Sequence, residues 1–129
     1  MMNDILSSAL AKIMNAEKVG KEFVLIRFTS KFMKDVFEIM NREGYIGSFE
    51  EIPISGGYLL KVNLLGRINK CNGIKPRFSV KKDSYEKYEK RFLPASDFGI
   101  LIVSTPKGLM THVEAKEKEV GGKLICYVY

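Results

Sequence analysis

Residues 98–104 read FGILIVS and give the strongest strand signal in the chain. A run of aliphatic and β-branched residues of this length predicts a buried strand. The following residues, 105–110, predict a turn, because Pro106 restricts the backbone and Gly108 permits conformations that other residues avoid. A buried strand that ends in a stiff turn therefore organises the C-terminal half of the chain.

The segments around this stretch predict an edge strand interrupted by a proline, a short exposed helix, a capped helix and a last strand. They lie, in that order, at residues 74–80, 83–91, 111–119 and 123–128. The capped helix carries a capping box formed by Thr111 and Glu114, and Gly121 and Gly122 end it.

The N-terminal half predicts two helices and three strands in the order α-β-α-β-β. They span, in that order, residues 5–19, 23–28, 31–43, 45–52 and 58–65. Asn3 or Asp4 is suited to cap the first helix, and Ser30 to cap the second. The stretch 55–57, Ser-Gly-Gly, predicts a hairpin between the last two strands.

Residues 66–73, GRINKCNG, are polar and contain two glycines, which is typical of a domain boundary. The sequence therefore predicts an α+β fold of two small domains. Residues 1–68 form an N-terminal α-β-α-β-β domain, and residues 69–129 form a C-terminal domain that is mainly β with short helices.

Apolar residues make up 46% of the 129 residues, which is enough for a packed core. The longest apolar run is far shorter than the roughly 20 residues that a membrane-spanning helix needs. The first residues lack the basic and apolar regions of a signal peptide, so we expect a cytoplasmic protein.

Cysteine and histidine usage argues against metal binding. Cys71 and Cys126 lie far apart, and in a reducing compartment we expect thiols instead of a disulfide. With His112 they lack the spacing of a zinc site, so no metal or other cofactor is expected. We expect Cys126 to be buried and inert, and His112 to be exposed at the start of a helix.

An enzyme is not expected either. The sequence lacks the glycine-rich dinucleotide and phosphate motifs, the metalloprotease motif and the nucleophile elbow. The carboxylate of Glu114 is accounted for by the capping box, without any role as a general base.

Positive charge is concentrated in one segment. Residues 61–91 contain ten Lys or Arg and three Asp or Glu, a net charge of +7, whereas the rest of the chain carries −1. A localised basic region is typical of a protein that binds a polyanion. A solvated surface without a partner explains the charge equally well.

The stretch Ser104–Gly108 combines groups that suit RNA. Its hydroxyls and backbone N–H groups can donate to phosphate, ribose or base edges, and Lys107 supplies charge. An ordinary connection between a strand and a helix explains the same residues. Aromatic residues also alternate with basic ones over 77–92, which suits base stacking, but packing of at least two of Tyr85, Tyr88 and Phe92 on a sheet is favoured.

The C-terminal stretch FGILIVSTPKGLMTHVEAKEKEVGGKLICYVY resembles the signature of the eighth small-subunit ribosomal protein family. The shared features are a strand, a Ser-Thr turn, a Gly and a Met, a helix with Ala, and Gly-Gly before the last strand. ILSSALAKIMNAEKVGK is similar to the first helix of the family, and FTSK to the start of its second. REGYIGSFE and GRINKCNGIKPRF resemble the archaeal and eukaryotic cytosolic branch.

This resemblance implies a structural constituent of the small ribosomal subunit that binds the central domain of 16S-type ribosomal RNA and helps to assemble the platform. It implies neighbouring ribosomal proteins as further partners, and neither a membrane nor a small-molecule substrate. The main RNA contacts that it implies, in the C-terminal domain, are Lys75, Arg77, Ser104, Thr105, Pro106, Lys107, Gly108, Thr111, Gly121 and Gly122. The second contact, in the N-terminal domain, comprises Asp4, Ser7, Asn15, Ser30 and Lys31.

The chain departs from the family pattern at two positions. Pro106 stands where the turn often has a second Ser, which removes a hydroxyl and an N–H donor. Ser79 stands near a Tyr of bacterial members, which removes a stacking ring.

Two other functions compete with this interpretation. A small enzyme or regulator could use Ser104–Gly108 as a phosphate or anion site, although no base or metal ligand is visible nearby. An adaptor could dock a partner protein through exposed strand edges, which is partly compatible with a ribosomal role.

Overall fold

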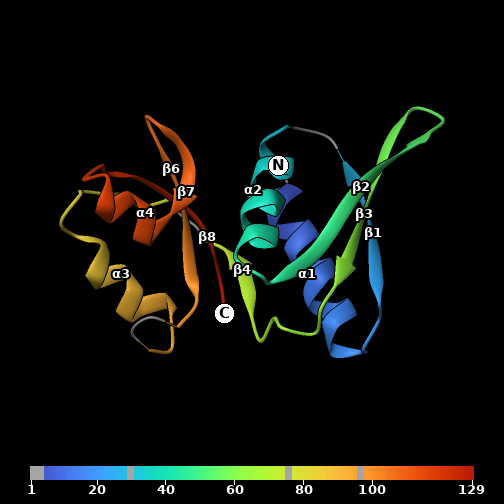
Figure 1. Ribbon diagram of the computed structural model, residues 1–129, viewed down its shortest axis with the longest axis horizontal. Coiled ribbons are helices and arrows are strands. Elements are labelled where there is room, and N and C mark those ends of the chain that lie inside the picture. Colours follow the sequence, from blue (N-terminus) through green and yellow to red (C-terminus); the bar gives the residue numbers. More distant parts are fainter. Residues whose placement is uncertain (1–4, 29–30, 75–76, 96–97) are drawn as a thin grey trace. The chain divides into compact units, whose positions relative to one another are not determined.

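A computed structural model describes residues 5–28, 31–74, 77–95 and 98–129. The chain divides into two compact units, Met1–Lys70 and Cys71–Tyr129, called unit 1 and unit 2 below (Figure 1). Each unit has its own antiparallel sheet with two helices, so the α+β class predicted from the sequence is confirmed.

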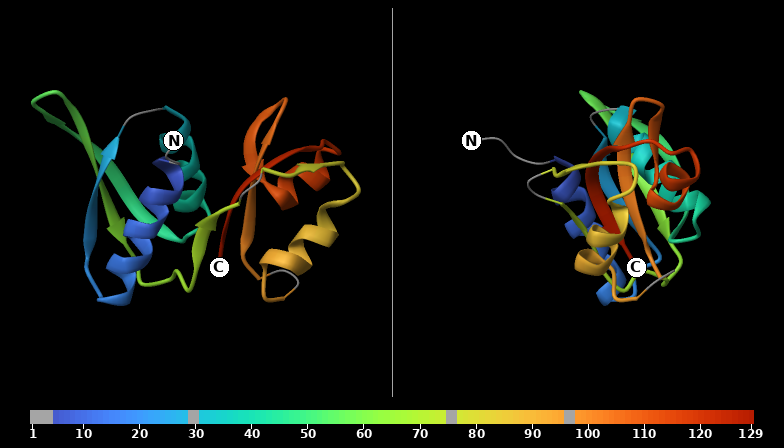
Figure 2. Two further views of the ribbon diagram at one scale, coloured as in Figure 1. Left: turned by 180° about the vertical axis from the view of Figure 1, so that it is seen from behind. Right: turned by 90° about the vertical axis from the view of Figure 1, so that its left-hand side faces the viewer.

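Unit 1 has the predicted order α-β-α-β-β. Its elements are α1 (Ile5–Lys18), β1 (Phe23–Phe28), α2 (Lys31–Arg42), β2 (Ile46–Ile54) and β3 (Gly57–Leu64). The strands pair in the order β1-β3-β2, all antiparallel. Both helices cover one face of this sheet (Figures 1 and 2). The caps expected at Asn3, Asp4 and Ser30 lie outside the described residues.

The core of unit 1 follows from the spacing of apolar residues in the sequence. On each helix the buried side chains recur every three or four residues, so they form one stripe that faces the sheet. The sheet contributes every second residue of its strands. The largest contributions are Leu10, Ile13, Met33, Phe37, Met40, Ile26, Leu60 and Val62, each at most 3% exposed.

The described residues of unit 2 form five strands and two short helices. Its elements are β4 (Cys71–Gly73), β5 (Ser79–Val80), α3 (Tyr85–Phe92), β6 (Ile100–Thr105), β7 (Gly108–Thr111), α4 (His112–Glu117) and β8 (Gly122–Val128). The sheet order is β4-β8-β6-β7, and β5 also pairs with β8.

The bounds predicted for a strand at 74–80 are wrong. Two short strands, β4 and β5, replace it, and both pair with β8. The last three residues of the stretch predicted as a linker belong to β4. Pro76, which is predicted to interrupt the strand, lies outside the described residues. The prediction rests on the chemistry of proline, which has no N–H to donate to a neighbouring strand.

The core of unit 2 lies between its helices and one face of its sheet. Tyr85 is 1% exposed and its hydroxyl donates to the carbonyl of Val120 at 2.9 Å. Burial raises the pKa of this hydroxyl. Tyr88 and Phe92 are partly buried against the same core, so the predicted packing of these three rings is confirmed.

His112 is buried, and its predicted exposure is wrong. Only 3% of the residue is exposed, and its Nδ1 accepts the backbone N–H of Leu101 at 3.1 Å. The Nε2 atom lies 3.9 Å from a carboxylate oxygen of Glu89 on α3, and Lys116 of α4 pairs with the other oxygen. The imidazole therefore links α4 to β6 and α3, a long-range contact that sequence spacing does not reveal.

Three further features bear on function. Both cysteines are thiols with buried side chains, as predicted for Cys126. In the described part of the chain, no three His, Cys, Asp or Glu side chains are grouped so that they could hold a metal ion. No helix among the described residues is long and apolar enough to cross a membrane.

Candidate nucleic-acid interface

The turn predicted over 105–110 is a β-hairpin. Gly108–Thr111 forms strand β7, which pairs with β6 in a register that places Thr105 opposite Gly108. The turn itself is reduced to Pro106 and Lys107, and Gly108 has a φ of +113°, which other residues rarely adopt. The sequence prediction missed β7 because a strand of four residues is specified mainly by its pairing with β6.

The hydroxyl of Thr105 holds this turn together. Thr105 is 8% exposed, and its Oγ1 donates to the carbonyl of Gly108 at 2.8 Å. The same oxygen accepts the backbone N–H of Lys107 at 3.1 Å. Its hydrogen-bonding capacity is therefore used largely inside the hairpin, while Pro106 and Lys107 are exposed at the tip.

Four residues form a row across the sheet beside this hairpin. Ser79 of β5 lies opposite Lys123 of β8, Lys123 lies opposite Ser104 of β6, and Ser104 lies opposite Leu109 of β7. Directly opposed residues share a face of a sheet, so these four side chains project to the same side. Ser79 and Lys123 are exposed, and Ser104 and Leu109 are half-buried. We call them the cross-strand row.

The other face of the same strands is the core of unit 2. Val80, Val103, Met110 and Leu124 adjoin the cross-strand row along their strands, and all four are buried against the helices. Because side chains alternate along a strand, the row must point away from this core. The fold thus directs the hydroxyl of Ser104 and the ammonium of Lys123 away from the packed interior.

Gly121 and Gly122 bring the row together by close packing. A Cβ at Gly122 would overlap the carbonyl oxygen of Ser104, and a Cβ at Gly121 would lie 2.5 Å from the carbonyl oxygen of Val80. Neither position tolerates a side chain without a shift of the backbone. These glycines are predicted as RNA contacts. The structure gives them another role, because the absence of a side chain lets β8 approach β5 and β6.

Thr111 also has an internal role. It is 2% exposed, its Oγ1 accepts the backbone N–H of Glu114 at 3.2 Å, and its own N–H donates to the carboxylate of Glu114 at 3.1 Å. The capping box predicted for these two residues is confirmed.

Further basic side chains precede and follow β5 in the chain and lie on α3. Lys81 and Lys82 are exposed directly after β5, and Arg77 is exposed shortly before it. The guanidinium of Arg91 on α3 lies over the ring of Phe78, 4.9 Å from its centroid, and 5.3 Å from that of Phe92. Lys75, predicted to join this group, lies outside the described residues.

The residues predicted for unit 1 are only partly described. Ser7 and Asn15 lie on α1, and Asn15 is exposed. The ammonium of Lys31, at the start of α2, pairs with Asp35 at 3.3 Å. Asp4 and Ser30 lie outside the described residues.

The sequence matches the family Ribosomal protein S8 over residues 4–129. The chain belongs to this family. It is therefore a structural component of the small ribosomal subunit and not an enzyme, which rules out the enzyme hypothesis for the Ser104–Gly108 turn. Its place is the ribosome, where its partners are ribosomal RNA and other ribosomal proteins.

Of the four residues in the cross-strand row, the sequence predicts only Ser104 as a contact; it does not single out Lys123 or Leu109, and it misjudges Ser79. Lys123 follows the two glycines, where the sequence predicts only the start of a strand. At Ser79 the sequence indicates only that the stacking ring of bacterial members is absent. A lysine next to Gly-Gly is a weak signal. Its position opposite both Ser79 and Ser104 follows from strand register, which the sequence does not display.

Proposed function

We propose that the chain binds directly to a stem in the central domain of small-subunit ribosomal RNA, and that the cross-strand row and the β6–β7 hairpin form the main contact. The observation that carries this proposal is the alignment of Ser79, Lys123 and Ser104 on the face of the sheet opposite the core. Two hydroxyls flanking an ammonium can engage ribose 2′-OH groups and phosphates at once.

The lysines and the hydroxyls of the site contribute to RNA binding in different ways. Lys81, Lys82, Lys123 and Lys107 neutralise phosphates, which gives affinity with little dependence on sequence. Ser104 supplies a positioned hydroxyl that distinguishes an irregular minor groove from a regular one. The hydroxyl of Thr105 acts indirectly, because it fixes the hairpin that presents Lys107.

Unit 1 would supply a second, weaker RNA contact through α1 and the start of α2. Ser7, Asn15 and Lys31 are its described members, and Asp4 and Ser30 complete the set that the family resemblance implies. With two contacts on separate units, early binding of this protein would help to order the platform of the small subunit.

Binding of purified variants to a transcribed central-domain stem, measured by filter retention, tests the main contact. Ser104→Ala should weaken binding by about 1 kcal/mol, roughly fivefold, through the loss of one hydrogen bond. Lys123→Ala should cost more, about 1.5–3 kcal/mol, because its bonds are to charged oxygens. Lys118→Ala, which changes an exposed lysine directly after α4 and outside the row, is the matched control and should bind like the wild type.

Equal affinities of Ser104→Ala, Lys123→Ala and the control would exclude the cross-strand row as the RNA contact. Thr105→Val separates direct from indirect action. It should alter the folding stability as well as the affinity, whereas Ser104→Ala should alter the affinity with little effect on stability.

A further inference from the structure

One edge of the sheet of unit 1, strand β1, has no second strand beside it in the described chain. In the order β1-β3-β2, β1 pairs with β3 and with no other strand of the described chain. The backbone N–H of Leu64 donates to the carbonyl of Glu22 at 2.8 Å, in the register that pairs Phe23 with Asn63. Because hydrogen-bonded and non-hydrogen-bonded pairs alternate in antiparallel sheets, the N–H and C=O groups of Phe23, Leu25 and Arg27 point away from β3.

The two edges of this sheet differ. The opposite edge strand, β2, contains Pro53 and has a register shift between Ile46 and Phe49. Prolines and bulges are the devices by which proteins prevent an edge from pairing with another chain. Strand β1 carries neither, and its register with β3 is regular over all six residues.

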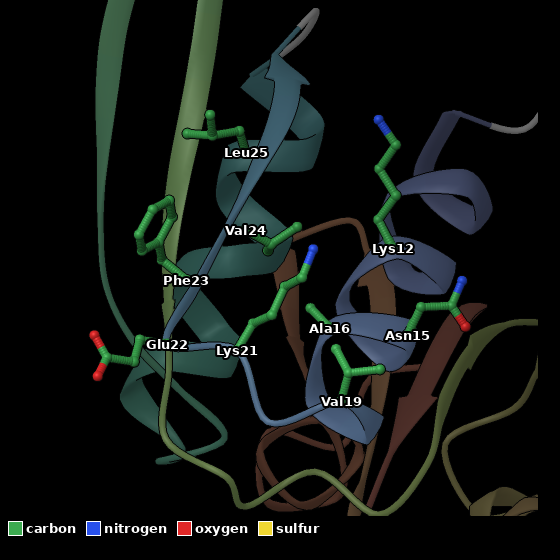
Figure 3. A pocket seen from close by; sticks show the side chains of 9 residues that line it. All are labelled: Lys12, Asn15, Ala16, Val19, Lys21, Glu22, Phe23, Val24 and Leu25. Carbon is green, nitrogen blue, oxygen red and sulfur yellow. The ribbon is translucent and has the colours of Figure 1, made fainter.

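A groove runs along the edge of β1, between this strand and α1 (Figure 3). Its volume is about 870 Å³. Val24 points from the strand toward α1, where Ala16 and Val19 lie, and Lys12 and Lys21 extend beside the opening (Figure 3). The lining residues are Lys12, Asn15, Ala16, Val19, Lys21, Glu22, Phe23, Val24 and Leu25.

The groove and the adjoining strand expose apolar surface and positive charge together. Val19 is 69% exposed, Phe23 44% and Leu25 43%. Two lysines and one glutamate line the groove. Exposed apolar side chains next to an open strand edge mark a surface that another chain covers.

We propose that a neighbouring protein of the small subunit adds an extended segment to the edge of β1, with apolar side chains facing the groove and acidic side chains near Lys12 and Lys21. The backbone groups of Phe23, Leu25 and Arg27 would complete a fourth strand, as in strand-addition complexes. Six residues, about 20 Å of extended chain, match the length of β1.

RNA suits this edge less well than a peptide. Phosphate oxygens accept hydrogen bonds but cannot donate to the outward carbonyls of Phe23, Leu25 and Arg27, whereas a peptide backbone offers both donors and acceptors at the required spacing. Asn15, which is proposed to contact RNA, lines the groove from α1 but does not belong to the strand edge. The inference rests on the family's place in the small subunit and does not depend on the cross-strand row.

Residue-resolved hydrogen exchange tests the proposal in three states: the protein alone, the protein bound to the central-domain stem, and purified small subunits. The amides of Phe23, Leu25 and Arg27 should exchange at least tenfold more slowly in subunits than in the other two states. The amides of Val24 and Ile26, which face β3, should be protected in all three. Rapid exchange at the edge within subunits would overturn the proposal, and protection by the stem alone would assign the edge to RNA instead.

Variants test the backbone and the charge components separately, in competition with wild-type protein for incorporation into subunits. Leu25→Pro removes an edge N–H without removing a bond to β3 and should lower incorporation severalfold. Lys12→Glu with Lys21→Glu should do the same, whereas Lys18→Glu, an exposed lysine of α1 outside the groove, should not. Circular dichroism verifies folding, and stem binding is measured in parallel. If Lys18→Glu were as damaging as the double variant, the acidic partner would be excluded.

Discussion

The β2–β3 and β6–β7 hairpins have the same plan but different turns. In unit 1, Ile54 lies opposite Gly57 across a turn of Ser55 and Gly56; in unit 2, Thr105 lies opposite Gly108 across Pro106 and Lys107. Each turn depends on glycine at positive φ, with Gly56 at +85° and Gly108 at +113°. The difference lies in what stiffens them.

The β6–β7 turn is fixed by a proline ring and by two hydrogen bonds of the Thr105 hydroxyl, one donated to Gly108 and one accepted from Lys107, which is exposed at the tip. The β2–β3 turn consists of Ser55 and Gly56, and Gly57 follows at the start of β3. A proline and a bonded hydroxyl restrict the backbone before any ligand arrives, so less conformational entropy is lost on binding. The stiffer hairpin is the one that adjoins the cross-strand row.

A change in the strand that supports the stiff hairpin should have the largest effect on folding. Gly122→Ala should destabilise the protein by about 2–3 kcal/mol, because its Cβ would overlap the carbonyl of Ser104 and meet Val103 at 2.9 Å. Gly47→Ala, in β2 of the other sheet, is the matched control. Its Cβ would come no closer than 3.3 Å, to Asn63, so the cost should be clearly smaller. Urea unfolding measures both, and equal costs would contradict the close approach of β8 to β6.

A second change removes the hydroxyl that closes the turn. Thr105→Val keeps the shape but leaves the backbone groups of Lys107 and Gly108 without this partner, at a cost of about 1–2 kcal/mol in folding free energy. Ser55→Ala in the other hairpin is the counterpart and should lie within about 0.5 kcal/mol of the wild type, as is usual for exposed positions. A stable Thr105→Val variant would mean that proline alone fixes the turn.

A third change replaces the proline that stiffens the turn with a residue that can donate a hydrogen bond to RNA. Pro106→Ser introduces the residue that the family resemblance leads us to expect there, with an added N–H and hydroxyl. Loss of the proline should lower the folding stability by about 0.4–1 kcal/mol through the unfolded state. If the added donor reaches RNA, affinity for the central-domain stem should nevertheless rise about fivefold, the effect of one hydrogen bond. Equilibrium unfolding and filter binding on the same preparation separate the two effects, and a fall in both would show that stiffness matters more than the donor.

The sequence predicted most of the fold because its signals are local. Periodic apolar residues specify α1 and α2, the run 100–104 specifies β6, and Thr111 with Glu114 specifies the start of α4. What it did not predict depends on pairing between distant residues. Strand β7 exists because β6 is next to it, β4 and β5 because β8 is long enough to pair with both, and His112 is buried because Leu101 and Glu89 approach it.

The same distinction applies to the site. Ser104, Lys107 and Gly108 could be singled out from the sequence because they lie in one turn. The cross-strand row could not, because Ser79, Ser104 and Lys123 are brought together by the register of three strands. The family resemblance predicts that Thr105 and Thr111 contact RNA, but the hydroxyls of both residues form hydrogen bonds within the fold.

The smallest effect on folding is expected when two positive charges outside the hairpin are removed. Lys81→Ala with Lys82→Ala removes two exposed lysines, so stability should stay within about 0.5 kcal/mol of the wild type. If both lysines contact phosphates, the slope of log affinity against log salt should become shallower by about two for any RNA. Ser104→Ala should leave that slope unchanged while it lowers affinity for the specific stem. Titrations at several salt concentrations, with the stem and an unrelated duplex, therefore distinguish the two kinds of contact. An unaltered slope in the double variant would remove these lysines from the RNA contact and leave the positive charge there to Lys107 and Lys123.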